Sequence, residues 1–208
     1  MGSHVKVNNK VLVRDLNRYR KVYRYIRKKP ELLECNDGTE ISSFTWGAYF
    51  VEFKHQHEFT HHFPCCYDGS PAVIATAVSK AITGGGETNS NFNVFVTDIT
   101  AGQCTFRTSG YFTGYVHYQA IKDGVYTVPD IGRTMEVKTL SYSNTNTQDY
   151  TFTVNGGAGF TCVPIVTATA DQDVNVFITS VSKTEVTVEV SQANYDGNVY
   201  LQAIEKGC

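Results

Sequence analysis

Asn93-Val94-Phe95-Val96-Thr97 recurs later in this chain as Asn175-Val176-Phe177-Ile178-Thr179. Working outward, Gln119-Ala120-Ile121 recurs as Gln202-Ala203-Ile204, each time five residues after a glycine. Upstream, Phe59-Thr60 followed by Pro71 recurs as Phe152-Thr153 followed by Pro164. Matching residues are 93 positions apart at the start of the repeat and 82 to 83 positions apart at its end. This difference indicates an insertion in the first copy, around Thr83–Asn89. Because surface loops tolerate insertions, these ordered matches predict two copies of one small domain.

The residues inside the two copies are typical of β-strands. Val186–Val190 alternates strictly between apolar and polar residues, and Val199, Leu201 and Ala203 share one face of a last strand. Glycine-containing turns separate the short apolar runs, and the aromatic-rich stretch 42–60 predicts one or two further strands. The expected fold class is all-β, with two tandem small antiparallel β-sandwich domains preceded by a basic N-terminal helix.

This pattern divides the chain into four segments. We expect an anchor segment at 1–58, a first sandwich at 59–122, a polar linker at 123–149 and a second sandwich at 150–208. Each sandwich is so small that its core is thin, and oligomerisation is the usual way in which such domains gain stability.

The N-terminus carries most of the positive charge. Residues 1–30 contain ten Lys or Arg and one acid, a balance of +9, whereas residues 31–208 contain eight Lys or Arg and 19 acids, a balance of −11. An apolar stripe from Val11 to Lys29 at steps of three and four residues predicts a helix that ends at Pro30. The stripe must pack on protein, so we expect a docking helix rather than nucleic-acid binding. The docking residues are Arg14, Arg18, Arg20, Lys21, Arg24, Arg27 and Lys28.

Targeting signals and cysteines limit the compartment. The N-terminus has no apolar signal-peptide region, and no apolar stretch approaches the length of a membrane span, so we expect no membrane insertion. The six cysteines occupy unrelated positions in the two copies, which favours free thiols over a disulfide framework. A reactive or metal-binding cysteine is the alternative.

Both copies resemble the H-type lectin domain in their strand order and anchors. The first copy matches through Phe59, Pro71–Ile74, Asn93–Thr97 and Val116–Ile121, and the second through the corresponding runs up to Ile204. The resemblance implies a sandwich that assembles as a trimer or a multiple of three, and it extends to modules of bacteriophage tail and fibre proteins. It therefore implies a virion location after synthesis in the host cytoplasm, with other virion proteins as partners.

The same resemblance implies a carbohydrate site between neighbouring chains, with aromatic side chains in the loop before the last strand. The corresponding residues are Tyr111, Phe112, His117, Asn194, Tyr195 and Asp196. The middle-strand arginine of the family is replaced by Phe95 and Phe177, so protein–protein packing is the alternative use of these aromatic residues.

One dense cluster of metal-type ligands lies at His55-Gln56-His57-Glu58, followed by His61-His62. Alternate residues of a strand share a face, so His55 and His57 are candidates for a metal ion shared around a threefold axis. A polar, partly buried strand without metal is the simpler interpretation, and no other cofactor is expected.

These observations favour a structural and adhesive function. We expect a bacteriophage tail, neck or fibre component that anchors by its N-terminus and presents lectin-like sandwiches for attachment or assembly. The alternative is a soluble multivalent carbohydrate-binding lectin. Because no catalytic motif stands out, we do not expect an enzyme.

Overall fold

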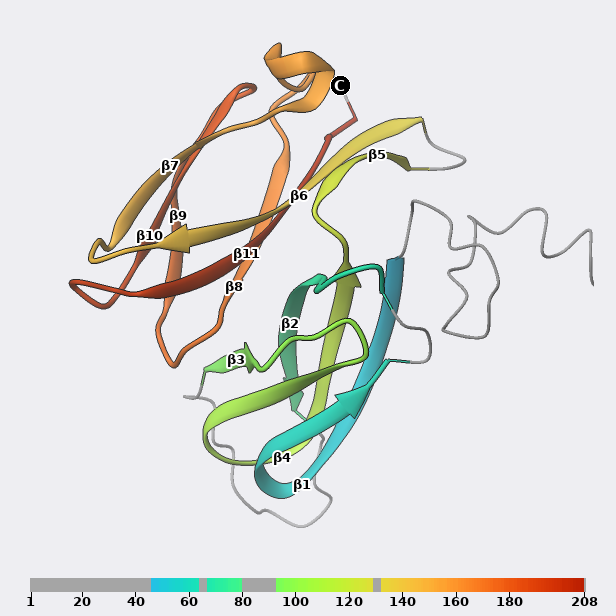
Figure 1. Cartoon of the computed structure of the whole chain (residues 1–208), viewed down its shortest axis with the longest axis vertical. Helices are drawn as coiled ribbons and strands as arrows, with labels where there is room; N and C mark the ends of the chain where they lie inside the picture. Colours follow the sequence, from blue (N-terminus) through green and yellow to red (C-terminus); the bar gives the residue numbers. More distant parts are fainter. Residues whose placement is uncertain (1–45, 64–66, 80–92, 129–131, 208) are drawn as a thin grey trace, which may run out of the picture.

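The computed structural model describes residues 46–63, 67–79, 93–128 and 132–207 (Figure 1). These residues form antiparallel sheets with no α-helix among them, which confirms the all-β class. The expected N-terminal helix and its basic docking residues lie outside the described ranges. Among the described residues, no helix is long and apolar enough to cross a membrane.

The first unit is built on two long, bent strands. Its strands are β1 (Trp46–His62), β2 (Ala72–Ser79), β3 (Val94–Thr97) and β4 (Gln103–Ile121). β4 pairs with both β1 and β2 along residues 114–121, and with β3 and the end of β1 along residues 103–108. Because β1 and β4 both bend, each contributes to two sheet-like layers that enclose a core.

The second unit reaches the same arrangement with shorter strands. They are β5 (Gly124–Val128), β6 (Arg133–Tyr142), β7 (Thr147–Thr151), β8 (Ile165–Ala170), β9 (Val176–Val181), β10 (Glu185–Val190) and β11 (Gly197–Ile204), with the 3-10 turn η1 (Val154–Gly157). One sheet has the order β5-β6-β11-β8 and the other β7-β10-β9. The segment 123–149, predicted to be a linker, therefore carries three strands, because its exposed polar residues lie on the outer faces of those strands.

Strand pairing shows that the two units repeat one topology. β4 pairs Gly114 with Phe53 and Ile121 with Trp46, and β11 pairs Gly197 with Tyr142 and Ile204 with Met135. The units thus correspond with an offset of 89 residues in the first strand, 93 in β2 and β8, and 82 to 83 afterwards.

This register corrects one of the sequence anchors. The Phe63 N–H donates to the carbonyl of Gly102 at 2.9 Å, and the Phe152 N–H donates to the carbonyl of Thr184 at 2.8 Å, which is the same bond of the repeat. Phe63 rather than Phe59 is therefore the counterpart of Phe152. Both phenylalanines are buried, whereas Phe59 only borders the core of its unit.

The bend in the first strand is also repeated. His55, at the bend of β1, has a φ of 52°, and Asn144, between β6 and β7, has a φ of 52°. The offset of 89 residues makes these the same position. Residues other than glycine seldom adopt a left-handed backbone conformation, although Asn and His tolerate it better than most. Because both units have this conformation at the same position, it belongs to the geometry of the bend.

Each unit has its own core from the inward faces of its strands. Val51, Phe53, Phe106, Val116 and other residues fill the first core. The second contains Val186, Val188 and Val190, and also Val199, Leu201 and Ala203, as the alternation of apolar residues predicted.

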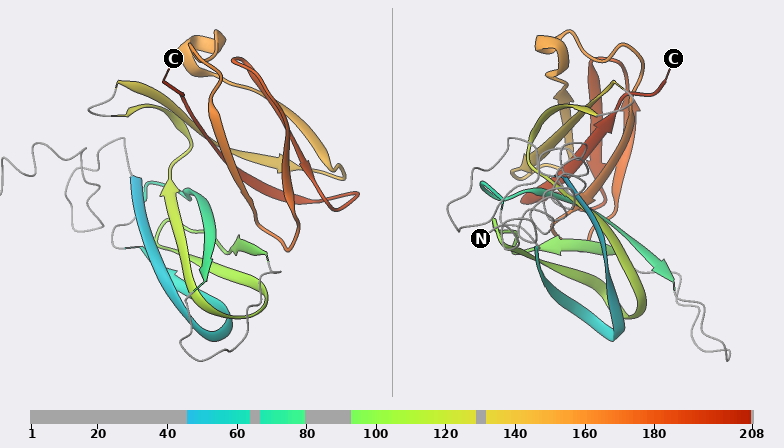
Figure 2. Two further views of the ribbon diagram at one scale, coloured as in Figure 1. Left: turned by 180° about the vertical axis from the view of Figure 1, so that it is seen from behind. Right: turned by 90° about the vertical axis from the view of Figure 1, so that its right-hand side faces the viewer.

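A third cluster joins the units at their outer sheet faces. Ala72, Ile74 and Ile121 of the first unit pack with Met135, Val137 and Tyr200 of the second. At the edge of this contact, the Thr169 hydroxyl accepts from the Ala75 N–H at 3.0 Å and thereby covers the free edge of β2. In both views of Figure 2 the second unit lies above the first, and the two meet at this contact.

The two cysteines in the described part of the chain differ. Cys104 is free and buried in the first core, and burial raises the pKa of its thiol to about 12. Cys162 is disulfide-bonded, which contradicts the expectation of free thiols for this residue.

Candidate functional site

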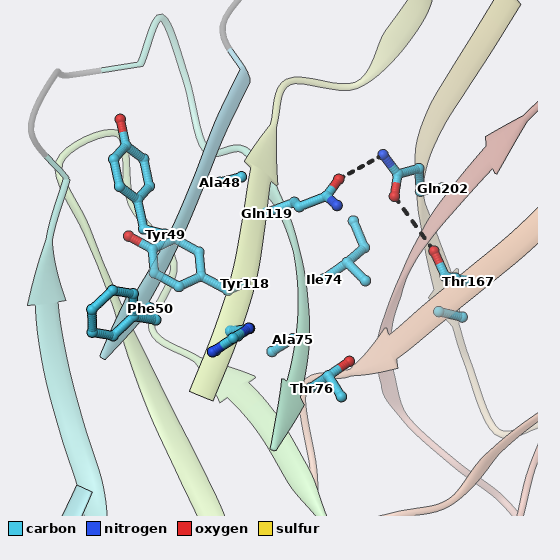
Figure 3. Close-up of a pocket in the computed structure, with 12 residues that line it drawn as sticks. Ala48, Tyr49, Phe50, Ile74, Ala75, Thr76, Tyr118, Gln119, Thr167 and Gln202 are labelled. Atoms are coloured by element: carbon cyan, nitrogen blue, oxygen red, sulfur yellow. Dashed lines mark hydrogen bonds between the residues drawn. The ribbon is translucent and has the colours of Figure 1, made fainter. Parts of the chain in front are cut away.

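A groove of about 620 Å³ lies between the outer face of the first unit and the edge of the second (Figure 3). β1, β2 and β4 form its floor, and β8 and β11 form its wall. The lining residues are Ala48, Tyr49, Phe50, Ile74, Ala75, Thr76, His117, Tyr118, Gln119, Thr167, Ala168 and Gln202.

The floor presents an exposed aromatic group. Phe50 is 62% exposed, and its ring lies 5.5 Å from that of Tyr115 in an edge-on contact and 6.0 Å from that of His117. Strand alternation explains this set, because Phe50 pairs with His117 across the β1–β4 ladder and both point away from the core. Tyr49, 42% exposed, also lines the groove, so the floor carries two neighbouring exposed aromatic rings rather than one isolated ring, and contiguous exposed patches of this kind mark binding surfaces.

The wall presents amides and hydroxyl groups. Nε2 of Gln202 donates to Oε1 of Gln119 at 2.9 Å, and the Thr167 hydroxyl donates to Oε1 of Gln202 at 3.4 Å (Figure 3). Thr76 adds a hydroxyl group at the foot of the wall. Because amides both donate and accept, this wall can satisfy a ligand with many hydroxyl groups.

None of the described residues that line this groove is Asp, Glu, Lys or Arg. An apolar ring on one side and neutral hydrogen-bonding groups on the other suit a neutral, amphipathic ligand.

The predicted carbohydrate residues are not brought together at this groove. His117 lines it, but Tyr111 lies six residues earlier in β4, roughly 20 Å away along an extended strand. Asn194 and Asp196 are exposed near the start of β11, where Oδ1 of Asp196 accepts from the Asn144 N–H at 2.8 Å.

Two of the predicted sugar-stacking residues belong to the cores. Phe112 is 4% exposed and packs on Phe53, and Tyr195 is fully buried with its hydroxyl donating to Asp171. These are the same position of the repeat, two residues before Gly114 and Gly197. Their rings fill the inside of the sheet and cannot stack on a sugar.

His55 and His57, at the bend of β1, both contact the ring of Tyr111. The His55 ring stacks on Tyr111 at 5.0 Å, and the His57 ring meets it edge-on at 5.2 Å. Within the described ranges, no group of three or more His, Cys, Asp or Glu residues is placed to hold a metal ion. The metal site at this pair stays a prediction about an assembly of several chains.

Sequence reasoning missed Phe50, Gln119 and Gln202 as members of one site. The repeated Gln-Ala-Ile run contained the signal for the two glutamines, since both are polar residues on the outer side of an apolar strand. Phe50 could not be distinguished from the other aromatic residues of 44–53 without knowing which face the second unit covers.

Comparison of the chain with protein-family models, curated proteins and solved structures finds no match.

Proposed function

We propose that this protein is a structural and adhesive component of a bacteriophage virion, and that the groove between its two units binds a neutral carbohydrate. Its basic N-terminal segment would attach it to the particle, and the two sandwich units would face outward. The observation that carries the proposal is the exposed Phe50 ring opposite the Gln119–Gln202 amide pair.

The chemistry of a pyranose fits both sides of the groove. Its apolar C–H face can stack on Phe50, as sugars do on aromatic rings, while its hydroxyl groups reach the amides and Thr167. Without a charged lining residue, the groove has no group that would favour a charged sugar over a neutral one.

The virion location rests on the resemblance of the two copies to lectin-like modules and on the charge of the first 30 residues. A closed homo-oligomer, a trimer or a multiple of three, would present several grooves at once. Multivalent attachment then converts weak single-site binding into strong adhesion.

A glycan array on the full-length protein, followed by calorimetry with the best ligand, tests the groove. We expect Phe50→Ala to weaken binding by about ten-fold, since a central aromatic group often dominates a binding site. Phe177→Ala is the matched control, because Phe177 is also exposed, at 50%, but lies on β9 away from the groove.

Tyr111→Ala tests the site expected from the sequence and should leave binding unchanged. Undiminished binding in Phe50→Ala, or no glycan bound at all, would refute the groove as a sugar site. A mass measurement gives the oligomeric state of the native assembly, but it does not distinguish a virion component from a free lectin. That distinction requires testing whether the protein is incorporated into virus particles. A monomer at micromolar concentration would contradict the oligomer.

A further inference from the structure

A second groove, of about 520 Å³, opens at the junction of the two units. The first unit contributes residues 70–71 and 97–99, and the second contributes β6, β11 and the turn after β8. The lining residues are Ser70, Pro71, Thr97, Asp98, Ile99, Thr139, Asp171, Gln172, Asn198 and Tyr200.

This groove is acidic, in contrast to the first. Asp98 and Asp171 line it, and none of the described residues that line it is Lys or Arg. Asp173 lies nearby and links the units by accepting from Nδ2 of Asn93 at 3.1 Å. Asp98 is exposed, and only its Oδ2 accepts from a described residue, the Thr97 hydroxyl at 3.0 Å. Its Oδ1 is available to a ligand.

Tyr200 provides a second, independent indication of a ligand. Its side chain is only 8% exposed, yet its hydroxyl makes no hydrogen bond to another residue of the described ranges, and it lines this groove. Burial, and then the carboxylates of Asp171 and Asp123, raise the pKa of this phenol. Tyr200 therefore stays neutral and offers an unused donor and acceptor beside two carboxylates.

Asp171 is held rigidly in place. Its Oδ2 accepts from the Asn198 N–H at 2.8 Å and from Asn198 Nδ2 at 3.1 Å, while Tyr195 binds the other oxygen. The negative charge at the groove is thus fixed by the fold. A positively charged side chain entering from solvent would meet Asp98 and Asp171 together.

We propose that this acidic groove receives Lys and Arg side chains from the basic segment 1–30 of the same chain. That segment carries a balance of +9, against −11 for the rest of the chain, so the charges are complementary. The proposal describes a free copy of the protein, whose segment 1–30 is not attached to a particle, and it is independent of whether the first groove binds sugar.

The position of Trp46 makes this contact accessible. Trp46 and Ala72 both pair with Ile121 of β4, one on each side, so they lie roughly 10 Å apart, two strand spacings. Ala72 directly follows Pro71 of the groove. Fifteen residues separate Pro30 from Trp46, enough to span up to about 50 Å. A tethered segment meets its own body at an effective concentration of about millimolar, which favours docking within one copy.

Carbodiimide cross-linking of the full-length protein, read by mass spectrometry, locates the docked segment. Lysines of 1–30 should link to Asp98 and Asp171 at low salt, and the links should fade at about 1 M salt, where charges are screened within about 3 Å. Mixing isotopically light and heavy protein distinguishes copies. Links mainly between copies, or spread evenly over other carboxylates such as Glu185, would overturn the proposal.

Limited trypsin digestion is a second measure of docking. It remains usable in a variant of Asp98, whereas carbodiimide needs the carboxylate that the variant lacks. Asp98→Asn removes the charge, and asparagine tolerates the left-handed φ of 51° at this position. We expect cleavage within 1–30 to become at least about five-fold faster, the change expected from losing ~1 kcal/mol of docking. Glu185→Gln, an exposed residue of β10, is the control and should leave the rate unchanged. Equal rates for wild type and Asp98→Asn would refute the docking site.

Discussion

Gln202 donates its amide N–H to the side-chain oxygen of Gln119 at 2.9 Å, and these two glutamines are the same position of the repeat. The two units therefore meet through equivalent surfaces. On one side of this contact, Val137 and Tyr200 of the second unit are buried in the junction. On the other side, the equivalent residues of the first unit, Ala48 and His117, line the first groove. Equivalent positions of the repeat thus lie in a buried cluster in the second unit and beside an open groove in the first.

The glutamine pair should contribute measurably to the stability of the junction. Gln202 is 4% exposed, and its Nε2 also lies 3.2 Å from Sδ of Met135. We expect Gln202→Ala to lower the free energy of unfolding by about 1 to 3 kcal/mol, as loss of a buried polar partner does. In a double-mutant cycle with Gln119→Ala, urea denaturation should give a coupling of about 1 kcal/mol. Simple additivity would mean that the bond contributes nothing.

Gly114 should not tolerate a side chain. A Cβ there would lie 2.6 Å from the carbonyl oxygen of Val78 and closer still to the buried Phe112 ring. We expect Gly114→Ala to destabilise the protein by about 1 to 3 kcal/mol through overpacking. Gly110→Ala is the control, since a Cβ at Gly110 meets nothing within 4 Å. Thermal unfolding of both variants decides the point, and equal melting temperatures would contradict it.

The all-β class and most strands could be predicted because local patterns determine them. Val186–Val190 alternates with the period of a strand, and the two Asn-Val-Phe runs are rich in β-branched and aromatic residues; together they form all of β3 and most of β9 and β10. The alignment of Phe59 with Phe152 was wrong. Both residues are followed by threonine, but it is Phe63 whose backbone N–H makes the hydrogen bond equivalent to that of Phe152, and the sequence does not show this. Residues 147–149 were assigned to the linker because the strand that begins there, β7, is polar and shows little apolar alternation.

The site was harder to predict because it depends on how the units pack. Tyr111 and Phe112 are neighbours in sequence, yet one is 60% exposed and the other 4%. Alternation along β4 could have separated them, because Phe112 shares its face with the buried Val116 and Tyr118. No sequence pattern shows which outer face the second unit leaves uncovered, so the role of Phe50 required the structure.

Glu136 should be essential for the second unit. This carboxylate is 1% exposed and accepts hydrogen bonds from the Tyr150 hydroxyl, from the N–H and hydroxyl of Thr153, and from the Val154 N–H. Glu136→Gln replaces an oxygen acceptor by an N–H₂ donor facing other donors. We expect a loss of about 3 kcal/mol, in the range for broken hydrogen bonds to a buried charge. Glu185→Gln, which is exposed, should change stability by less than about 0.5 kcal/mol.

Protonation of His61 should lower stability in mild acid. Burial, and secondarily the neighbouring His62, depress its pKa below the usual 6.5, and its Nε2 is buried beside the rings of Phe63 and Tyr118. Because the unfolded chain then binds the proton first, the contribution of neutral His61 is complete above pH 6.5 and is lost progressively as the pH falls toward the depressed value.

His61→Phe keeps the aromatic contacts and removes the titrating group. Urea denaturation between pH 7.5 and 5, a range set around the usual histidine pKa of about 6.5, should show a falling stability in the wild type and a shallower fall in the variant. His117→Phe, on the exposed outer face, is the control and should keep the wild-type slope. An unchanged slope in His61→Phe would show that other groups determine the acid sensitivity. A slope of opposite sign would mean that His61 gains a partner for its charged form in the folded protein.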